Sequence, residues 1–262
     1  MKVSDYVVLK VGSIIYLIVN IENDVVKLKG LNYRIYASAN IQDVRLATPD
    51  EIKLEKEKCE KYALRITNLR KRDEGCLLGK VLHIDGDRLY LDKCMSLYEQ
   101  LGIYAYGALI NEENMAKEID SYINQIRPEV IVVTGHDLYN GQGIKDLDNY
   151  SNTKNFIEAI KAIRKNPITI NAVVIAGACQ SNYEALIANG ADFASSPKRI
   201  NVHTFDPAVV AIKASTTSML RVIQLKDALK YIENGKDAFG GIETMGKMRL
   251  ILWLWKPMQK LI

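Results

Sequence analysis

Hydrophobic residues come in short strand-like runs in the first part of this chain and alternate between strand and helix spacing further on. Apolar runs at residues 7–9, 14–19, 25–28 and 33–36 are rich in β-branched and aromatic side chains, which favour strands. Asn23 and Asp24, and the segment 29–32, supply turn residues between them. The pattern predicts a small SH3-like β-barrel over residues 1–47.

The segment that follows is dominated by charge. Residues 50–74 hold 15 charged side chains among 25, with only an uneven apolar face. This pattern predicts a charged, solvated helical linker over residues 48–78. Arg70, Lys71 and Arg72 lie in this linker.

Beyond residue 79 the apolar pattern alternates between strand and helix. Strands are expected at 80–84, 103–110, 130–134 and 172–176, and helices at 90–101, at 111–127 behind an Asn111 cap, from 151 onward and at 180–189. Strands that alternate with helices form a parallel sheet with helices on both faces. We therefore expect an α/β domain over residues 79–262.

Two of the expected strands end at residues that can do acid/base or nucleophilic chemistry. The strand from Val130 leads through Gly135 to His136, and the strand from Ala172 leads to Cys179. Carboxyl ends of parallel strands meet at one edge of a sheet, where ligands bind, so the two side chains could face one crevice. Cys179 and His136 are therefore a candidate catalytic dyad.

The chemistry of such a pair depends on the ionisation of the thiol. A neighbouring imidazolium and a helix N-terminus both lower a cysteine pKa, and Cys179 is expected to have both, because the helix 180–189 follows it. The amides at that helix end would also suit an oxyanion. The alternatives are a cysteine that is a small buried hydrophobic residue and a histidine that is a polar surface group.

Composition and charge narrow the class of protein. With 262 residues, 48% of them hydrophobic, the chain can bury a full core. The net charge of +4 is too small to demand a polyanionic partner, so no nucleic acid is expected. The longest uncharged apolar stretch, residues 11–21, is too short to cross a bilayer, and no signal peptide is visible. We expect an intracellular protein that does not bind membranes.

Neither a metal site nor a disulfide framework is expected. The cysteines show no CxxC pairing and no histidine at zinc-ligand spacing: Cys59, Cys76, Cys94 and Cys179. His83 is followed by Asp85, Gly86 and Asp87, but this stretch lacks the further carboxylates of an EF-hand. We interpret it as a turn.

Four blocks in order carry a resemblance to a known family. They are Val133-Thr134-Gly135-His136-Asp137, Ala176-Gly177-Ala178-Cys179-Gln180-Ser181, Ala194 through His203, and Gly240-Gly241-Ile242-Glu243-Thr244. With these blocks the chain resembles the YabG family of sporulation-specific cysteine proteases over nearly its whole length. The Ala178-Cys179-Gln180 core is also similar to that of caspases, although Gly135-His136 inverts the caspase order of histidine and glycine.

The resemblance implies a broadly caspase-like cysteine endopeptidase that needs no cofactor. It implies that His136 and Cys179 are catalytic, that the substrates are spore-coat and cortex-associated proteins, and that cleavage follows arginine. The expected location is the cytoplasm of the mother cell, or the spore coat. A pocket for arginine needs a carboxylate, because a guanidinium is always charged. The candidate substrate-binding residues are Asp206, Asp137 and Glu243, in that order.

Other possibilities stay open at this stage. His203 is expected to be structural, since one histidine suffices and His136 is better placed. An arginine-specific enzyme could cut itself at Arg70–Arg72. The segment from Leu250 to Trp255 is a final strand, an oligomer contact or an altered tail. The rival hypothesis is a non-catalytic adaptor with an SH3/KOW-like barrel that binds protein or RNA; the oligomeric state is undecided.

Overall fold

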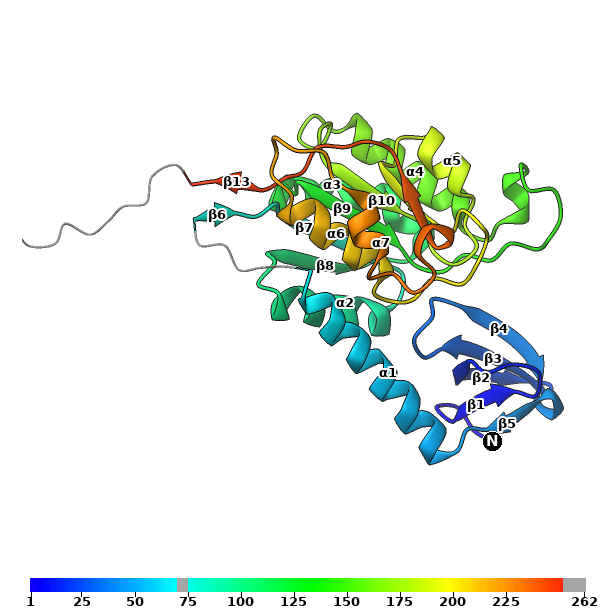
Figure 1. Ribbon diagram of the computed structural model, residues 1–262. Helices are drawn as coiled ribbons and strands as arrows, with labels where there is room; N and C mark the ends of the chain where they lie inside the picture. Colours follow the sequence, from blue (N-terminus) through cyan, green and yellow to red (C-terminus); the bar gives the residue numbers. More distant parts are fainter. Residues whose placement is uncertain (70–74, 252–262) are drawn as a thin grey trace, which may run out of the picture.

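The computed structural model describes residues 1–69 and 75–251. An antiparallel sheet at the N-terminus lies beside a larger α/β unit, and a long helix runs along the side of both (Figure 1). The hypothetical cleavage site at Arg70–Arg72 and the tryptophan-rich segment beyond Ile251 lie outside the described residues.

The N-terminal strands form an open sheet. They are β1 (Tyr6–Leu9), β2 (Ile15–Glu22), β3 (Val25–Gly30), β4 (Tyr36–Asn40) and β5 (Val44–Leu46), in the order β4-β3-β2-β1-β5. The expected closed barrel is not found among the described residues, because β4 and β5 stand at opposite edges and do not pair with each other. The antiparallel strands themselves are confirmed, and alternate residues such as Val7, Ile18 and Val26 bury one face.

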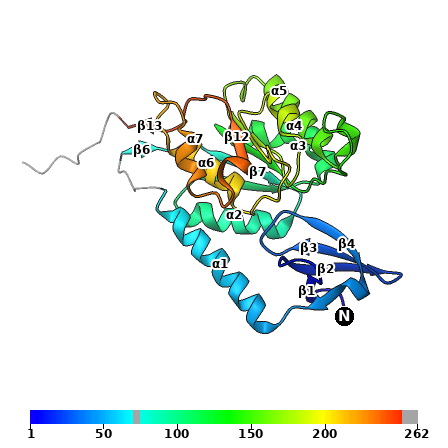
Figure 2. The ribbon, with the colours of Figure 1, turned by 45° about the vertical axis from the view of Figure 1, so that its right-hand side comes forward.

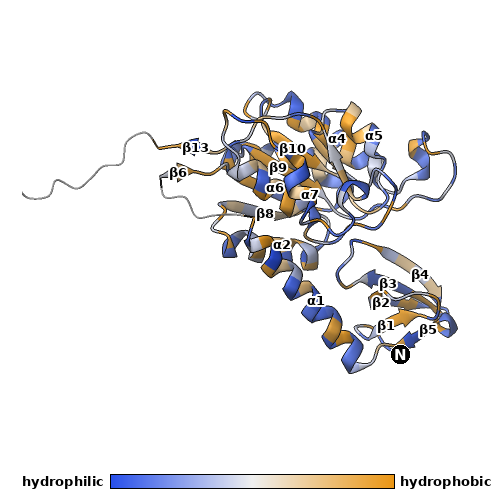
Figure 3. Ribbon diagram, viewed as in Figure 1, coloured by the Kyte–Doolittle hydropathy of each residue, from blue (hydrophilic) through white to orange (hydrophobic). Residues whose placement is uncertain are grey.

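Helix α1 (Pro49–Thr67) occupies the charged segment. Its start is stabilised by a capping box, in which Thr48 and Glu51 each accept a hydrogen bond from the other's backbone, followed by Pro49 in the first turn. Only Ile66 is fully buried in it, and most of the helix is hydrophilic on its outer side (Figure 3). This exposure explains why the segment carries so many charged residues.

The larger unit contains the parallel sheet predicted from the alternating pattern. Its strands are β7 (Val81–Asp85), β8 (Ala105–Leu109), β9 (Val130–Thr134), β10 (Val173–Ala176), β11 (Phe193–Ser195) and β12 (Phe239–Gly241), in the order β12-β11-β10-β9-β7-β8. All neighbouring pairs are parallel except β11 with β12. The parallel sheet is therefore confirmed, with one antiparallel edge strand.

Helices cover both faces of this sheet (Figure 2). Strand residues of one parity, including Val130 and Val132, pack with α2 (Arg88–Gln100), α6 (Asp206–Thr216) and α7 (Leu225–Leu229). Residues of the other parity, including Ile131 and Val133, pack with α3 (Met115–Ile126), α4 (Thr153–Lys165) and α5 (Tyr183–Ala188). Strands buried on both faces explain the continuous apolar runs in the sequence.

The remaining short elements connect these layers. They are the 3₁₀ turns η1 (Ile41–Asp43), η2 (Glu112–Asn114), η3 (Leu147–Asn149) and η4 (Gly235–Asp237), and the paired strands β6 (Cys76–Leu77) and β13 (Arg249–Leu250). The expected Asn111 cap is wrong: Asn111 makes no capping hydrogen bond and is followed by η2 before α3 begins at Met115. None of the helices in residues 1–69 and 75–251 is both long and apolar enough to cross a membrane.

Candidate active site

The two strands that lead to His136 and Cys179 are neighbours in the sheet. Strands β9 and β10 pair in parallel, with Val133 opposite Ala176, and the Thr134 hydroxyl donates to the Gly177 carbonyl at 2.8 Å just beyond them. His136 and Cys179 follow on the same edge. Within the described chain their side chains make no hydrogen bond to each other.

Cys179 is fully buried in a loop rather than at the start of a helix. Its sulfur accepts the Val202 amide at 3.1 Å, and the thiol donates to the Val202 carbonyl at 3.7 Å. The expected helix N-terminus at Cys179 is wrong, because α5 begins only at Tyr183 behind an Asn182 cap. Burial raises the Cys179 pKa to about 12, so the thiol is protonated in this arrangement.

His136 is held by a carboxylate that the sequence analysis interpreted as part of a turn. Its Nε2 lies 3.2 Å from Oδ2 of Asp87, which caps α2, while its Nδ1 is buried without a hydrogen-bond partner among residues 1–69 and 75–251. The ring packs against Tyr36 of β4, with the ring centres 3.9 Å apart, and its amide donates to Glu112 at 2.8 Å. The carboxylate, the Tyr36 ring and the Tyr90 ring, whose centre lies 5.4 Å away, fix the imidazole in one orientation.

Asp87 is an ionised carboxylate shared between the two units. It also accepts from Nζ of Lys29 at 3.0 Å and from the Tyr36 hydroxyl at 3.2 Å. Burial alone would raise the pKa of Asp87, but the hydrogen bonds from His136 and Lys29 and the charge of Lys29 outweigh it, so the pKa lies below its ordinary value. Asp87 thus stays charged and can stabilise an imidazolium at His136.

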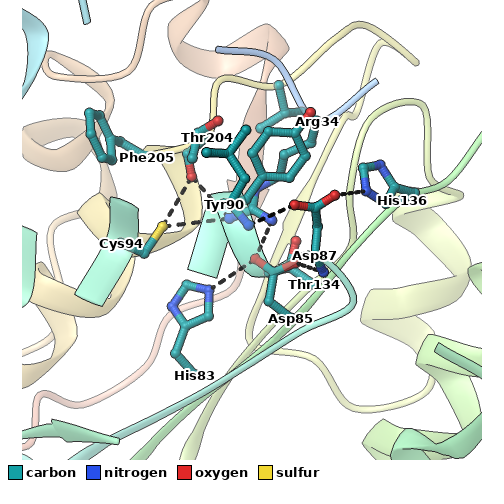
Figure 4. Close-up of polar contacts among 12 residues, drawn as sticks. Arg34, His83, Asp85, Asp87, Tyr90, Cys94, Thr134, His136, Thr204 and Phe205 are labelled. Carbon is teal, nitrogen blue, oxygen red and sulfur yellow. Dashed lines mark hydrogen bonds and ion pairs between the residues drawn. The ribbon is translucent and has the colours of Figure 1, made fainter. Parts of the chain in front are cut away.

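A second buried charge pair lies beside Asp87 (Figure 4). Nη1 of Arg34 lies 2.5 Å from Oδ2 of Asp85, the last residue of β7, and both side chains are fully buried. Nη2 of Arg34 donates to the Thr204 carbonyl at 3.1 Å and lies 3.5 Å from the sulfur of Cys94. The guanidinium also lies 5.3 Å from the centre of the Tyr90 ring. Arg34 comes from the N-terminal unit and the other four residues from the α/β unit.

These carboxylates were missed as site residues, although a signal existed in the sequence. Asp85 and Asp87 follow the strand predicted at residues 80–84, and β7 is the neighbour of β9 on the side opposite β10. The rule applied to His136 and Cys179 therefore also covers them. The two carboxylates were not considered as site residues because the stretch that contains them was interpreted as a turn.

The three acidic residues proposed for an arginine pocket lie in different surroundings. Asp206 is buried at the start of α6 and accepts from the Tyr62 hydroxyl at 2.6 Å; burial raises its pKa to about 7 despite that bond. Asp137 is buried too and accepts from the Ser181 hydroxyl at 2.8 Å, from the Asn152 amide at 2.7 Å and from the Thr153 hydroxyl at the start of α4. Glu243 is exposed. Burial raises the Asp137 pKa.

The two other histidines are buried among aromatic rings. His203 packs against Tyr62, with ring centres 4.4 Å apart, and burial lowers its pKa to about 3. Its Nδ1 accepts the Phe205 amide at 3.2 Å. His83 contacts the Tyr98 hydroxyl at 2.9 Å, and burial lowers its pKa as well. Both rings are neutral at pH 7.

The glycines before the two site residues make room for side chains of this chain. A Cβ on Gly135 would collide with the carboxylate of Glu112, which bonds the His136 amide. Gly177 has φ +101, and a Cβ there would lie 2.6 Å from the Ser195 hydroxyl. Close packing around the strand ends thus requires glycine at both positions.

The described residues contain no group of three or more histidine, cysteine, aspartate or glutamate side chains that could hold a metal ion. What the site offers is a thiol and a carboxylate-bound imidazole on adjacent strand ends of an α/β sheet. A thiol and a carboxylate-bound imidazole on one edge of an α/β sheet are groups of the kinds that nucleophilic hydrolases use.

Comparison with known proteins identifies the family. The chain belongs to the YabG peptidase family U57, whose model matches residues 2–252. It is 42% identical over 175 residues to the sporulation-specific protease YabG of Bacillus subtilis (strain 168), an alignment that covers 66% of this chain. The chain spans 60% of the length of that relative. No solved structure matches.

Proposed function

We propose that this chain is a cysteine endopeptidase of sporulation in which Cys179 is the nucleophile and His136 the general acid and base. The observation that carries the proposal is the parallel pairing of β9 with β10, which brings both residues to one sheet edge with Asp87 bound to the imidazole. Membership of a peptidase family supports the same reaction class.

The reaction needs two proton transfers, one to His136 and one from it. The Cys179 thiol gives its proton to His136, and the sulfur forms a bond to the peptide carbonyl carbon; the C–N bond then breaks and the amine leaves with that proton. Water hydrolyses the resulting thioester. The charge of Asp87 stabilises the imidazolium formed in between.

The oxyanion is expected to bind to backbone amides near the nucleophile. The Cys179 amide donates no hydrogen bond to any residue in the described ranges, so it can donate to a substrate oxygen. The His136 amide already donates to Glu112 and is not free for that role. A second donor must therefore come from another amide near His136.

The substrates proposed are spore-coat and cortex-associated proteins, cleaved after arginine. The setting is a sporulating bacterium, in the cytoplasm of the mother cell or at the spore coat. The similarity to a sporulation-specific protease supports this setting. We also propose that the sheet with its two catalytic strand ends is caspase-like and that the N-terminal sheet is related to SH3-like barrels.

One observation favours the alternative, a non-catalytic adaptor. Cys179 is fully buried and burial raises its pKa to about 12, which is what an inert structural cysteine shows. The peptidase proposal requires the cover over the site to move, so that His136 can take the thiol proton.

The test compares variants on an arginine-containing coat protein as substrate. Cys179→Ala should abolish cleavage while circular dichroism and Tm stay near those of the unchanged protein. The matched control is Cys59→Ala, which removes a half-buried thiol from α1 and should retain activity. Cleavage by the Cys179→Ala protein would refute the assignment. Absence of cleavage by all forms, with no iodoacetamide labelling of Cys179 at mildly acidic pH, would favour the adaptor.

A further inference from the structure

A short segment of the N-terminal unit lies on the α/β unit like an added β-strand. The Arg34 amide donates to the Val202 carbonyl at 3.1 Å, and the Thr204 amide donates to the Asn32 carbonyl at 2.9 Å. Between them Tyr33 and His203 form an antiparallel bridge. Main-chain pairing of this kind is how an extended peptide binds beside an open strand.

The side chain of Arg34 points from this segment into a pocket suited to a guanidinium. Asp85 supplies the charge, the Thr204 carbonyl accepts a second hydrogen bond, and the Tyr90 ring and Cys94 form the wall. Removing an arginine from water is costly unless it is paired and hydrogen-bonded. These contacts give the charge of Arg34 a carboxylate and both terminal nitrogens an acceptor, while Nε has no hydrogen-bond partner among the described residues.

The backbone of Arg34 is next to the proposed nucleophile. The carbonyl oxygen of Val202 accepts both the Arg34 amide at 3.1 Å and the Cys179 thiol at 3.7 Å. Two groups that share one acceptor oxygen must be close neighbours. The backbone of Arg34 therefore lies close to the Cys179 sulfur.

The same segment covers the histidine. Tyr36 packs on the His136 ring, and Tyr36 and Lys29 both bind Asp87. The Tyr90 hydroxyl, a single donor, lies 2.6 and 2.7 Å from the carbonyl oxygens of Gly30 and Tyr33, and so holds the loop that carries Arg34. Lys29 of β3, Tyr36 of β4 and the loop between them thus lie against His136 and its carboxylate partner.

We propose that residues 32–34 occupy the substrate cleft of this protein as an internal substrate-like segment, with Arg34 in the pocket that receives a substrate arginine and Asp85 as the carboxylate that recognises it. This inference rests on the proposed function, because it assigns a pocket to the arginine preference. A substrate can bind only when this segment leaves. Asp85 then determines specificity, a role for which Asp206, Asp137 and Glu243 were the candidates from sequence.

The test measures binding in full-length protein that carries Cys179→Ala, so that no cleavage occurs. Arg34→Ala is added to empty the pocket, and the probe is a fluorescently labelled Asn-Tyr-Arg amide, which copies residues 32–34. Fluorescence anisotropy should show saturable binding. An otherwise identical citrulline peptide, and the Arg peptide on protein that also carries Asp85→Asn, should bind at least about tenfold more weakly.

The matched control is Arg164→Ala in the same Cys179→Ala protein. Arg164 also pairs with a carboxylate, Asp192, at 2.7 Å, but its removal leaves Arg34 in place. This control should bind the Arg peptide at least about tenfold more weakly than the Arg34→Ala protein. Equal binding by the control would refute the proposal.

Two further measurements distinguish a folding defect in the Arg34→Ala protein from a failure of the proposed pocket. The Arg peptide should raise its Tm, since a ligand stabilises the state that binds it, and the citrulline peptide should not. If Arg34→Ala does not fold, Arg34→Lys keeps a cation near Asp85 and should still bind the Arg peptide more tightly than the control does. A folded variant that binds both peptides equally, or ignores Asp85→Asn, overturns the proposal.

The experiments distinguish a failure of the proposed arginine pocket from a failure of Cys179 as nucleophile. Peptide binding is measured without a nucleophile, so retained cleavage by the Cys179→Ala protein would refute Cys179 as nucleophile and leave the pocket standing. Loss of cleavage with no arginine-selective binding would refute the pocket and leave the nucleophile standing.

Discussion

Replacing Arg34 by methionine should destabilise the protein strongly at neutral pH. Methionine keeps much of the apolar stem but leaves Asp85 as a fully buried carboxylate without its 2.5 Å partner. Breaking a buried ion pair on one side costs about 3–5 kcal/mol, a large part of the ~5–15 kcal/mol that a typical domain has. For a chain of this length the Tm should fall by roughly 10 °C.

The pH dependence of that loss follows from the pKa of Asp85. Burial would raise this pKa, but the charge of Arg34 and its hydrogen bond, together with His83 at 3.8 Å, outweigh burial and lower it. In the unchanged protein Asp85 therefore adds stability above its unfolded pKa of about 3.9, and this stability is lost as pH falls through the lower folded pKa. In Arg34→Met burial dominates and the Asp85 pKa rises, so stability is regained as pH falls from that raised value towards the unfolded pKa.

The assay is urea unfolding at pH 7 and pH 5, with Cys179→Ala in every protein to prevent digestion. The stability difference between Arg34→Met and its parent should be smaller at pH 5. Adding Asp85→Asn to Arg34→Met removes the unpaired charge and should restore at least about half of the loss. A loss below about 1 kcal/mol at pH 7, or one that grows towards pH 5, would refute this account of the buried pair.

Three other changes give separate outcomes. Asp87→Asn should lower kcat on the order of 10²-fold and alter its pH profile, because His136 loses the charge that stabilises its protonated form; an unchanged profile would mean that Asp87 is only structural. Gly135→Ala should cost about 1–3 kcal/mol in urea unfolding, because its Cβ collides with Glu112, and the cost should shrink in a Glu112→Ala protein; equal costs in both would count against that contact. Iodoacetamide at pH 6 should label Cys179 slowly in the unchanged protein and faster in Arg34→Met, as peptide mass mapping would show, and equal rates would argue against the loop as a cover.

The parallel sheet could be predicted because its strands carry strong local signals. The runs that begin at Val130 and Val173 are apolar on both faces, which only a strand covered on both sides tolerates. The same rule put His136 and Cys179 at one edge of the sheet. Local pattern was enough for these features because each depends on neighbours close in sequence.

Features that depend on distant residues could not be predicted. Arg34 and Asp85 are separated by 51 positions, and nothing in either local pattern indicates that they meet in a buried pair. The start of α5 was misplaced because Asn182, not Cys179, makes the capping bond. Closure of the N-terminal sheet was also wrong, since strand content does not fix whether two edges meet.

Helix α1 tethers the N-terminal unit to the α/β unit, so residues 32–34 compete with substrates for the cleft while they remain attached to the protein. Its 19 residues form a stiff rod about 28 Å long, anchored near one end by Ile66. A released segment therefore stays within a short radius of the pocket, where tethering raises its effective concentration above that of a free peptide. A protein substrate has to outcompete that local concentration, so the enzyme would favour substrates that are themselves concentrated, as components of an assembled protein layer are.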